Sequence, residues 1–186
     1  MIQVIDNCIP EEMQNEMLSI CTSTILPLSY NKYTTSPHAK RILRGFGHLF
    51  LAYEGTLSPY ADALSKPAKT VLPDKDLVRG RLFLQLPVQT NEIGEYHVDF
   101  QRDHLTMIYY VNDTDGDTLF SSHNDSEFSD NLSEGEKFSI VNSENTIQKR
   151  VTPKKGRCVV FDGRIYHASS TPTIDDRFVL NYNFKP

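Results

Sequence analysis

The segment Tyr96-His97-Val98-Asp99 places an imidazole and a carboxylate two residues apart. On a β-strand, residues i and i+2 point to the same face, so these two side chains can converge on one metal ion. The chain has six histidines and also contains His123-Asn124-Asp125, so a pair of this kind arises easily by chance. We interpret that second copy as coincidence, because it lies in a polar stretch without apolar alternation. The pair at 97 and 99 lies between two strand-like segments and is the stronger candidate.

His167 is the candidate for a third ligand. It follows an apolar run that ends at Phe161 and the tight turn Asp162-Gly163, which together would place its imidazole at the mouth of a barrel. Taken alone, a histidine in this position is more typical of a core or capping residue than of a metal ligand. Two imidazoles and one carboxylate form a set that leaves coordination positions open, as in non-haem Fe(II) sites. Thiolates would favour zinc, and a shell of oxygens would favour magnesium.

Arg177 opens the run Arg-Phe-Val-Leu-Asn-Tyr-Asn-Phe, which ends at Phe184. In a strand, alternation puts Arg177, Val179, Asn181 and Asn183 on one face and the four larger apolar residues on the other. We expect the apolar face to be core and the polar face to line a barrel interior, while a solvent-exposed polar face would fit the same pattern. A buried arginine requires a partner, and a ligand carboxylate held through two N–H···O bonds would supply it.

The surrounding pattern predicts helices first and many short strands afterwards. A strand is expected at Ile2–Ile5, a helix from Pro10 to about residue 23, and a second helix over 56–72. Further strands are expected at Arg79–Leu86, His104–Val111, Phe138–Val141, Arg157–Phe161 and Arg177–Phe184. The polar segment 29–47 fits either a solvated loop or a flap over an active site, and the acidic stretch Ser121–Glu136 fits a mobile surface loop. This order indicates an α+β chain that ends in a sandwich or barrel.

Length and composition favour one domain, with residues 1–76 as a helical support and 77–186 as the β core. The net charge of −5 disfavours general nucleic-acid binding. Three cysteines without a CxxC pair argue against a disulfide framework. No apolar run reaches the ~18 residues of a membrane span, and the N-terminus does not resemble a signal peptide. We therefore expect no membrane association and a reducing, cytoplasmic setting, whereas the oligomeric state stays open.

The sequence resembles the 2-oxoglutarate/Fe(II)-dependent dioxygenases, particularly their prolyl-4-hydroxylase-like branch. The resemblance is carried by His97-x-Asp99, His167 and, ten residues later, Arg177. The similarity runs from Val4-Ile5-Asp6-Asn7 to Phe184. The resemblance implies a double-stranded β-helix, a jelly-roll or cupin-like barrel, with the N-terminal helices packed on one sheet.

The resemblance also implies roles for individual residues. His97, Asp99 and His167 would hold Fe(II), and Arg177 would pair with the distal carboxylate of 2-oxoglutarate. The stretch Thr106–Asn112 is similar to a strand of oxygen-sensing prolyl hydroxylases in which a tyrosine binds the cosubstrate. Further residues expected at the cosubstrate are therefore Tyr110, with Tyr109 as the alternative, Gln85 and Asn181.

Besides Gln85, which stands where the family often has Tyr or Asn, three positions depart from the pattern that this family usually shows. Asp115 replaces the first glycine of a Gly-Gly turn, Val179 replaces a residue such as serine, and Asn183 replaces an aromatic residue. These departures leave the iron hypothesis intact and weaken any inference about the substrate.

The leading hypothesis is a dioxygenase that uses Fe(II), 2-oxoglutarate and O2, with ascorbate as a further candidate. It would hydroxylate a prolyl or other peptide side chain, or a small molecule, and release succinate and CO2. The alternatives are a metal-dependent cupin enzyme that does not use 2-oxoglutarate and a non-catalytic barrel that only binds a ligand. Arg177 favours the first hypothesis over the second, and the intact ligand set argues against the third.

Overall fold

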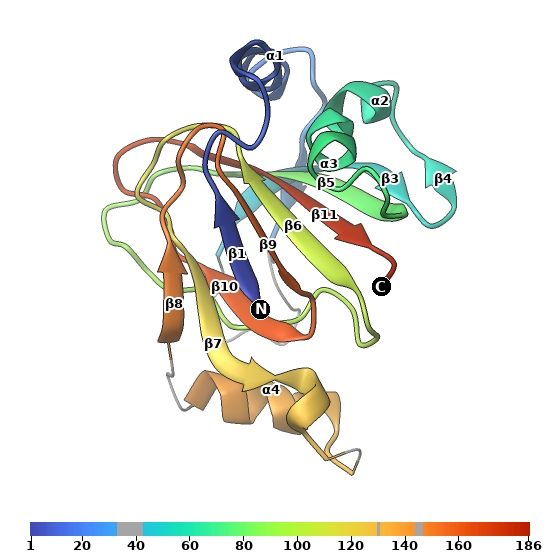
Figure 1. Cartoon of the computed structure of the whole chain (residues 1–186). Coiled ribbons are helices and arrows are strands. Elements are labelled where there is room, and N and C mark those ends of the chain that lie inside the picture. The colour runs from blue at the N-terminus through green and yellow to red at the C-terminus, as the bar shows by residue number, and fades with distance from the viewer. Residues whose placement is uncertain (33–42, 130, 144–146) are drawn as a thin grey trace.

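The computed structural model describes residues 1–32, 43–129, 131–143 and 147–186, and two antiparallel β-sheets dominate it (Figure 1). The larger sheet consists of β1 (Ile2–Ile5), β2 (Ser29–Asn31), β3 (Gly45–Ala52), β4 (Gly55–Thr56), β5 (Leu77–Gln85), β6 (Leu105–Tyr110), β9 (Cys158–Asp162) and β11 (Arg177–Phe184). The smaller sheet consists of β7 (Thr118–Asn124), β8 (Ile147–Val151) and β10 (Ile165–Ser169).

The strand order is β1-β9-β6-β11-β5-β3-β2 in the larger sheet, with β4 paired to β3, and β10-β7-β8 in the smaller one. From β6 onward the chain crosses repeatedly between the sheets: β6, β9 and β11 lie in the larger, and β7, β8 and β10 lie in the smaller. This is the arrangement of a jelly roll, so the expected double-stranded β-helix is confirmed.

Three helices cover one face of the larger sheet (Figure 1), namely α1 (Glu11–Cys21), α2 (Ala61–Leu64) and α3 (Lys66–Val71). Met17, Leu64 and Ala68 from these helices form one buried cluster with sheet residues such as Leu82 and Tyr182. The packing of N-terminal helices on one sheet is thereby confirmed. No helix in the described part of the chain is long and apolar enough to cross a membrane.

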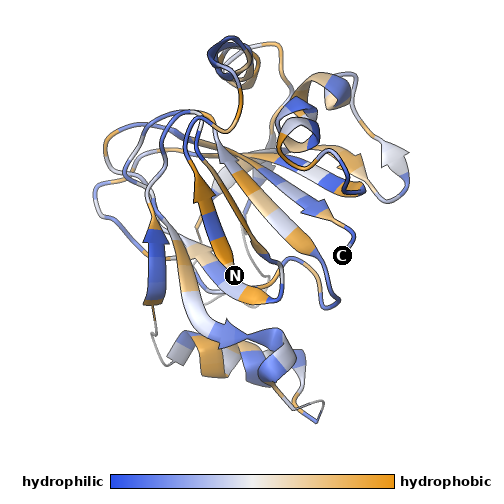
Figure 2. Cartoon of the chain, viewed as in Figure 1, coloured by the Kyte–Doolittle hydropathy of each residue, from blue (hydrophilic) through white to orange (hydrophobic). Residues whose placement is uncertain are grey.

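Strand β11 separates two cores, and all of its residues are buried. Phe178, Leu180, Tyr182 and Phe184 join the cluster beneath the helices, whereas Val179 joins a second cluster between the sheets. In Figure 2, hydrophilic and hydrophobic residues both occur along this strand. The face that begins with Arg177 therefore points into the barrel and not into solvent.

Two short helices replace the single helix expected over 56–72. Helix α2 ends at Ser65, which also precedes the first turn of α3. Pro67 has no N–H to donate to the preceding turn, and proline is compatible with a helix only near its start. The chain therefore begins a new helix at this point, and residues 55–56 belong to β4.

The predictions of a loop at Ser121–Glu136 and of a strand at Phe138–Val141 were both wrong. Strand β7 extends to Asn124 and a 3-10 helix, η1, covers Asp125–Glu127. The segment Phe138–Val141, expected as a strand, lies inside helix α4 (Glu134–Ser143). Ser133 and Glu136 explain that helix, because the Ser133 N–H and hydroxyl both donate to the Glu136 carboxylate in a capping box.

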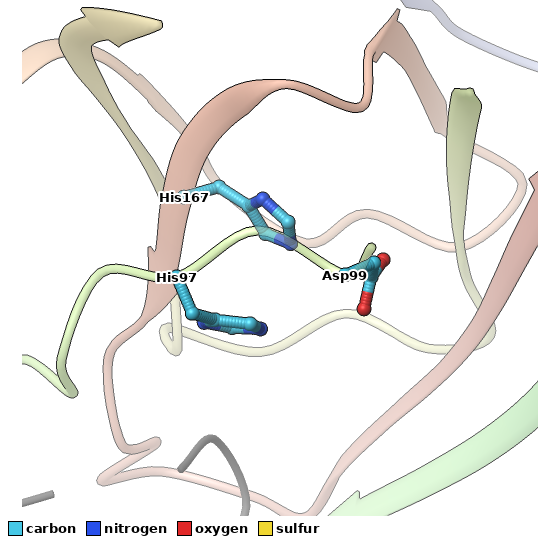
Figure 3. A group of neighbouring side chains, drawn as sticks. All are labelled: His97, Asp99 and His167. Atoms are coloured by element: carbon cyan, nitrogen blue, oxygen red, sulfur yellow. The ribbon is translucent and has the colours of Figure 1, made fainter. Parts of the chain in front are cut away.

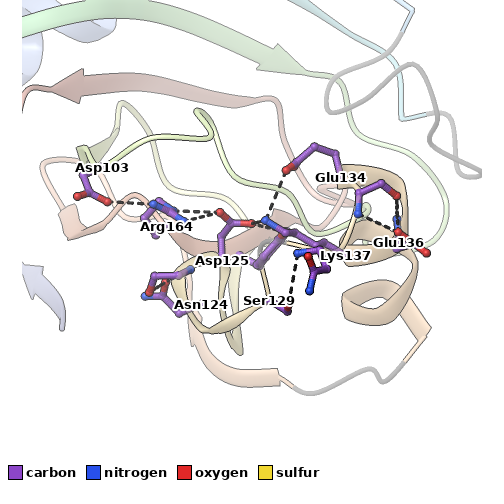
Figure 4. A network of polar contacts seen from close by, with 12 residues as sticks. Asp103, Asn124, Asp125, Ser129, Glu134, Glu136, Lys137 and Arg164 are labelled. Carbon is purple, nitrogen blue, oxygen red and sulfur yellow. Dashed lines mark hydrogen bonds and ion pairs between the residues drawn. The ribbon is translucent and has the colours of Figure 1, made fainter.

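A buried carboxylate organises this region (Figure 4). Asp125 is 2% exposed and forms ion pairs with Arg164 at 2.7 Å and Lys137 at 3.3 Å. The Tyr166 hydroxyl donates to the same carboxylate. Asp125 thus connects η1 and α4 to the turn that enters β10, which explains why the stretch is ordered despite its polar composition.

The first 76 residues contribute strands as well as the expected helices. Strand β1 pairs with β9 as an edge of the larger sheet, and β3 pairs with β5. Within segment 29–47, which was expected to be a loop or flap, β2 pairs with the beginning of β3. Residues 33–42 of that segment lie outside the described residues.

Candidate active site

His97, Asp99 and His167 converge on one point (Figure 3). One potential ligand atom of each lies within 4.8 Å of those of the other two. His167 is on β10, and His97 runs beside it in an isolated antiparallel bridge, with a main-chain hydrogen bond of 3.0 Å in each direction. The two imidazole centroids are 4.6 Å apart. The sheet geometry itself therefore brings the two histidines together across 70 residues of chain.

Both imidazoles are held so that one nitrogen stays available. The Nδ1 atoms lie 3.4 Å from the Glu95 carbonyl for His97 and 3.2 Å from the Ile165 carbonyl for His167. Burial lowers the pKa of His97 to about 3, with His167 adding to the effect, and burial also lowers the pKa of His167. Both rings are thus neutral at physiological pH, which is the form that binds a metal.

Four side chains support the carboxylate of Asp99. Arg79 and Arg81 contact its Oδ1 at 2.8 and 3.4 Å, and Asn183 and Asn181 donate to its Oδ2 at 2.9 and 3.1 Å. Burial alone raises the pKa of this carboxyl, but His167 and the two guanidinium groups outweigh it and hold the pKa well below its usual range. Asp99 is therefore ionised and fixed in orientation.

Arg177 and the two histidines line one cavity. The arginine is 4% exposed and donates to the Gly116 carbonyl at 2.6 Å, Gln85 Oε1 at 3.1 Å and Thr118 Oγ1 at 2.9 Å. All three acceptors are neutral, and no carboxylate of the described residues lies within ion-pair distance of the guanidinium. A buried, uncompensated cation of this kind is costly, so the cavity is suited to an anionic ligand.

The other expected cosubstrate residues lie at different depths. Gln85 and Asn181 line the cavity, and Gln85 also donates to Ser169. Tyr110 is fully buried and is not among the lining residues. Its hydroxyl donates a hydrogen bond to Thr118, which does line the cavity, at 2.8 Å. Tyr109 belongs to the opposite core beneath the helices, so Tyr110 is the tyrosine on the side of the cavity.

Two residues near Arg177 were missed in the sequence. Thr118 lines the cavity and accepts hydrogen bonds from both Tyr110 and Arg177. A Cβ at Gly116 would lie 2.7 Å from Cδ of Arg177 and 3.0 Å from the Ser170 carbonyl. The glycine that remains in the Asp115-Gly116 turn is therefore the one that leaves room for the arginine.

These residues fit an iron and a dicarboxylate ligand. Two imidazole nitrogens and one carboxylate on one side of a metal match the ligand set of non-haem Fe(II) oxygenases. In the same cavity, Arg177 offers a fork of N–H donors suited to a carboxylate.

Comparison with known families agrees with this geometry. The model of the 2OG-Fe(II) oxygenase superfamily matches residues 88–185, which is more than half of the chain. Comparison with curated proteins gave no match.

Solved structures with a similar fold include three that illustrate the range of relatives. The non-haem α-ketoglutarate-dependent epimerase SnoN from nogalamycin biosynthesis has a TM-score of 0.63 at 12% identity, covering 99% of this chain and 76% of that one. A Pseudomonas putida prolyl-4-hydroxylase has a TM-score of 0.63 at 13% identity, covering 100% and 92%. HygX from Streptomyces hygroscopicus, with nickel, 2-oxoglutarate and hygromycin B bound, has a TM-score of 0.58 at 12% identity, covering 100% and 82%.

Proposed function

Because the chain belongs to the 2OG-Fe(II) oxygenase superfamily and carries the site for Fe(II) and 2-oxoglutarate, we propose that it hydroxylates an organic substrate and releases succinate and CO2. One observation carries this proposal. The cavity that contains the two histidines also contains Arg177, a buried cation with only neutral partners. A metal site without an acid-binding residue would not account for that cation.

Each residue then has a defined task. His97, Asp99 and His167 hold the metal, which when bound supplies the activation of O2. Arg177 pairs with the distal carboxylate of 2-oxoglutarate, while Gln85 and Asn181 offer it further polar contacts.

Supporting residues keep these groups in place. Tyr110 fixes the hydroxyl of Thr118, and Thr118 in turn fixes the guanidinium of Arg177. Arg79 and Asn183 fix the carboxylate of Asp99. Preorganisation of this kind reduces the entropy lost when metal and cosubstrate bind.

The proposal extends to the prolyl-4-hydroxylase-like branch and to a prolyl or other peptide side chain, or a small molecule, as substrate. Its support is the similarity of Thr106–Asn112 to the corresponding strand of that branch. The aromatic residue that the branch often has at position 183 is here Asn183, which binds Asp99. A reducing, cytoplasmic setting is part of the proposal and rests on the sparse cysteines, all free thiols.

Succinate formation tests the proposal directly. Purified protein is incubated with Fe(II), ascorbate, O2 and 2-oxoglutarate, since enzymes of this kind turn over slowly without a primary substrate. We expect succinate from the wild type, none from His167→Ala, and strongly reduced formation from Arg177→Met. Lys69→Gln, which changes an exposed lysine on α3, is the matched control. Succinate formation that does not depend on His167 and Arg177 would contradict the proposal.

Hydroxylation itself requires a second measurement. Candidate peptides and small molecules are screened by mass spectrometry for a product heavier by one oxygen atom. A product formed by desaturation or epimerisation, without oxygen gain, would keep the cosubstrate assignment and exclude the hydroxylase.

A further inference from the structure

A second arginine, Arg81, lines the same cavity as Arg177. It lies on β5 directly opposite Asn181 of β11, so its side chain faces the metal site from the neighbouring strand. Its guanidinium carbon lies 4.6 Å from the centroid of the Phe83 ring, which also lines the cavity. Apart from its 3.4 Å contact to Asp99, the function proposed above gives this arginine no task, and the following inference about the substrate rests on that function.

The hydrogen bonds of Arg81 leave most of its donors unused. A guanidinium offers five N–H donors, and within the described part of the chain Arg81 makes one hydrogen bond, the 3.4 Å contact to Asp99. Its Nε is buried and has no partner among the described residues, while 28% of the side chain stays exposed. Burial lowers the pKa of Arg81 to about 10, so the group remains a cation at neutral pH.

Arg79, two residues earlier on the same strand, is a useful contrast. It contacts Asp99 at the shorter distance of 2.8 Å, and its Nε donates to Asn183 Oδ1 at 2.8 Å. Its guanidinium stacks on the ring of Phe100 at 4.1 Å, and it does not line the cavity. Both arginines keep a buried nitrogen without a hydrogen-bond partner among the described residues, but only Arg81 lines the cavity.

The charges of the site point the same way. Arg79, Arg81 and Arg177 carry +3 and Asp99 carries −1, which leaves +2 among the charged side chains that line the cavity or contact Asp99. Fe(II) adds +2 and 2-oxoglutarate adds −2, so the loaded site keeps a net charge of +2. In a poorly solvated cavity such an excess favours binding of a further anion.

The rest of the lining indicates an organic anion. Phe83, Ile108 and Val179 contribute apolar surface to the cavity beside Arg81. From these contacts and charges we propose that Arg81 binds an acidic group of the primary substrate, a carboxylate or a phosphate monoester attached to an apolar carbon skeleton.

A binding experiment tests this without knowledge of the natural substrate. Protein loaded with Mn(II) and 2-oxoglutarate under nitrogen is titrated with benzoate, phenyl phosphate and the neutral control benzamide, and the melting temperature is followed. We expect stabilisation by at least one of the two anions and none by benzamide. Benzoate and phenyl phosphate separate the carboxylate from the phosphate form of the proposal. Stabilisation by neither anion, or equally by benzamide, would overturn it.

Substitution of Arg81 provides the second part of the binding experiment. Loss of a desolvated charge pair should raise the dissociation constant of the bound anion by roughly 30-fold or more in Arg81→Gln. Arg81→Lys should recover part of the affinity, and Lys69→Gln should match the wild type. The dissociation constant of 2-oxoglutarate is measured in the same preparations. If Arg81→Gln weakens the binding of 2-oxoglutarate as much as it weakens the binding of the anion, Arg81 serves the cosubstrate and the inference fails.

The two proposals fail in different ways. Succinate formation in the absence of substrate is measured on the same wild-type preparation. If succinate is formed but neither anion gives the expected stabilisation, only the role of Arg81 is wrong. If it is absent, the proposed function falls as well.

Discussion

Replacement of Arg177 by methionine should separate ligand affinity from folding. The substitution keeps an unbranched side chain in the cavity and removes the buried cation together with its three hydrogen bonds. In the ligand-free protein, each lost hydrogen bond costs about 1 kcal/mol, and removal of an uncompensated buried charge returns several kcal/mol. These contributions have opposite sign, so we expect the ligand-free variant to melt within a few degrees of the wild type.

The effect on 2-oxoglutarate binding should be much larger. At a ligand concentration of 100 times the dissociation constant, binding stabilises the wild type by about 2.7 kcal/mol. For a chain of this length that corresponds to roughly 5–11 °C in melting temperature. Loss of the charge pair costs at least about 2 kcal/mol, which raises the dissociation constant roughly 30-fold. At the same ligand concentration the stabilisation then falls to about 0.9 kcal/mol, or roughly 2–4 °C.

The assay is a thermal melt of Mn(II)-loaded protein under nitrogen, with and without 2-oxoglutarate, so that turnover does not consume the ligand. Arg177→Lys retains the charge without the planar fork and should give an intermediate shift. Lys69→Gln should give the wild-type shift. A full wild-type shift in Arg177→Met would show that 2-oxoglutarate is held elsewhere and would refute the reasoning about the buried cation.

Three further predictions concern groups around the site. Gly116→Ala should raise the KM for 2-oxoglutarate roughly tenfold, because its Cβ would displace the Arg177 side chain; an unchanged KM would contradict this. Asp125→Ala should lower the free energy of unfolding in urea by about 3 kcal/mol because it leaves Arg164 without its buried carboxylate, and a change below 1 kcal/mol would be too small for such a pair. Burial lowers the pKa of His104, so the unfolded chain binds protons more readily and stability falls as pH drops below about 6.5. The urea midpoint of metal-free protein should therefore fall less between pH 7.5 and 5.5 in His104→Leu, and an equal fall would exclude this contribution.

The parts of the site that could be predicted follow from the two-residue period of β-strands. Arg177 and Asn181 share a face of β11 for that reason, whereas His97 forms only an isolated bridge and Asp99 lies in a bend, so the expected strand at 97–99 is not present. The alternation also distinguishes Tyr110 from Tyr109 once it is known which face of β6 packs beneath the helices and which lies between the sheets. These inferences require only local geometry, and the structure brings the histidines and Asp99 together as the spacing suggests.

The region around α4 could not be predicted from composition. Its polar residues indicate solvent, but Asp125 is buried by partners up to 41 residues away. A local signal was present, since Ser133 and Glu136 have the spacing of a capping box. The β-branched and aromatic residues of Phe138–Val141 favoured a strand, and the N-terminal cap decided for a helix.

The support of Asp99 shows why strand register matters more than motif. Arg79 lies opposite Asn183 and Arg81 lies opposite Asn181, so two cross-strand pairs of β5 and β11 converge on a carboxylate from a third segment. No spacing within one strand reveals such a set, because each residue is unremarkable until the register is known. Asn183, which looked like a departure from the family pattern, becomes a requirement once Arg79 is its neighbour. By the same reasoning, a relative that keeps an aromatic residue at this position would have to hold its metal-binding aspartate by other means, and would not need an arginine at position 79.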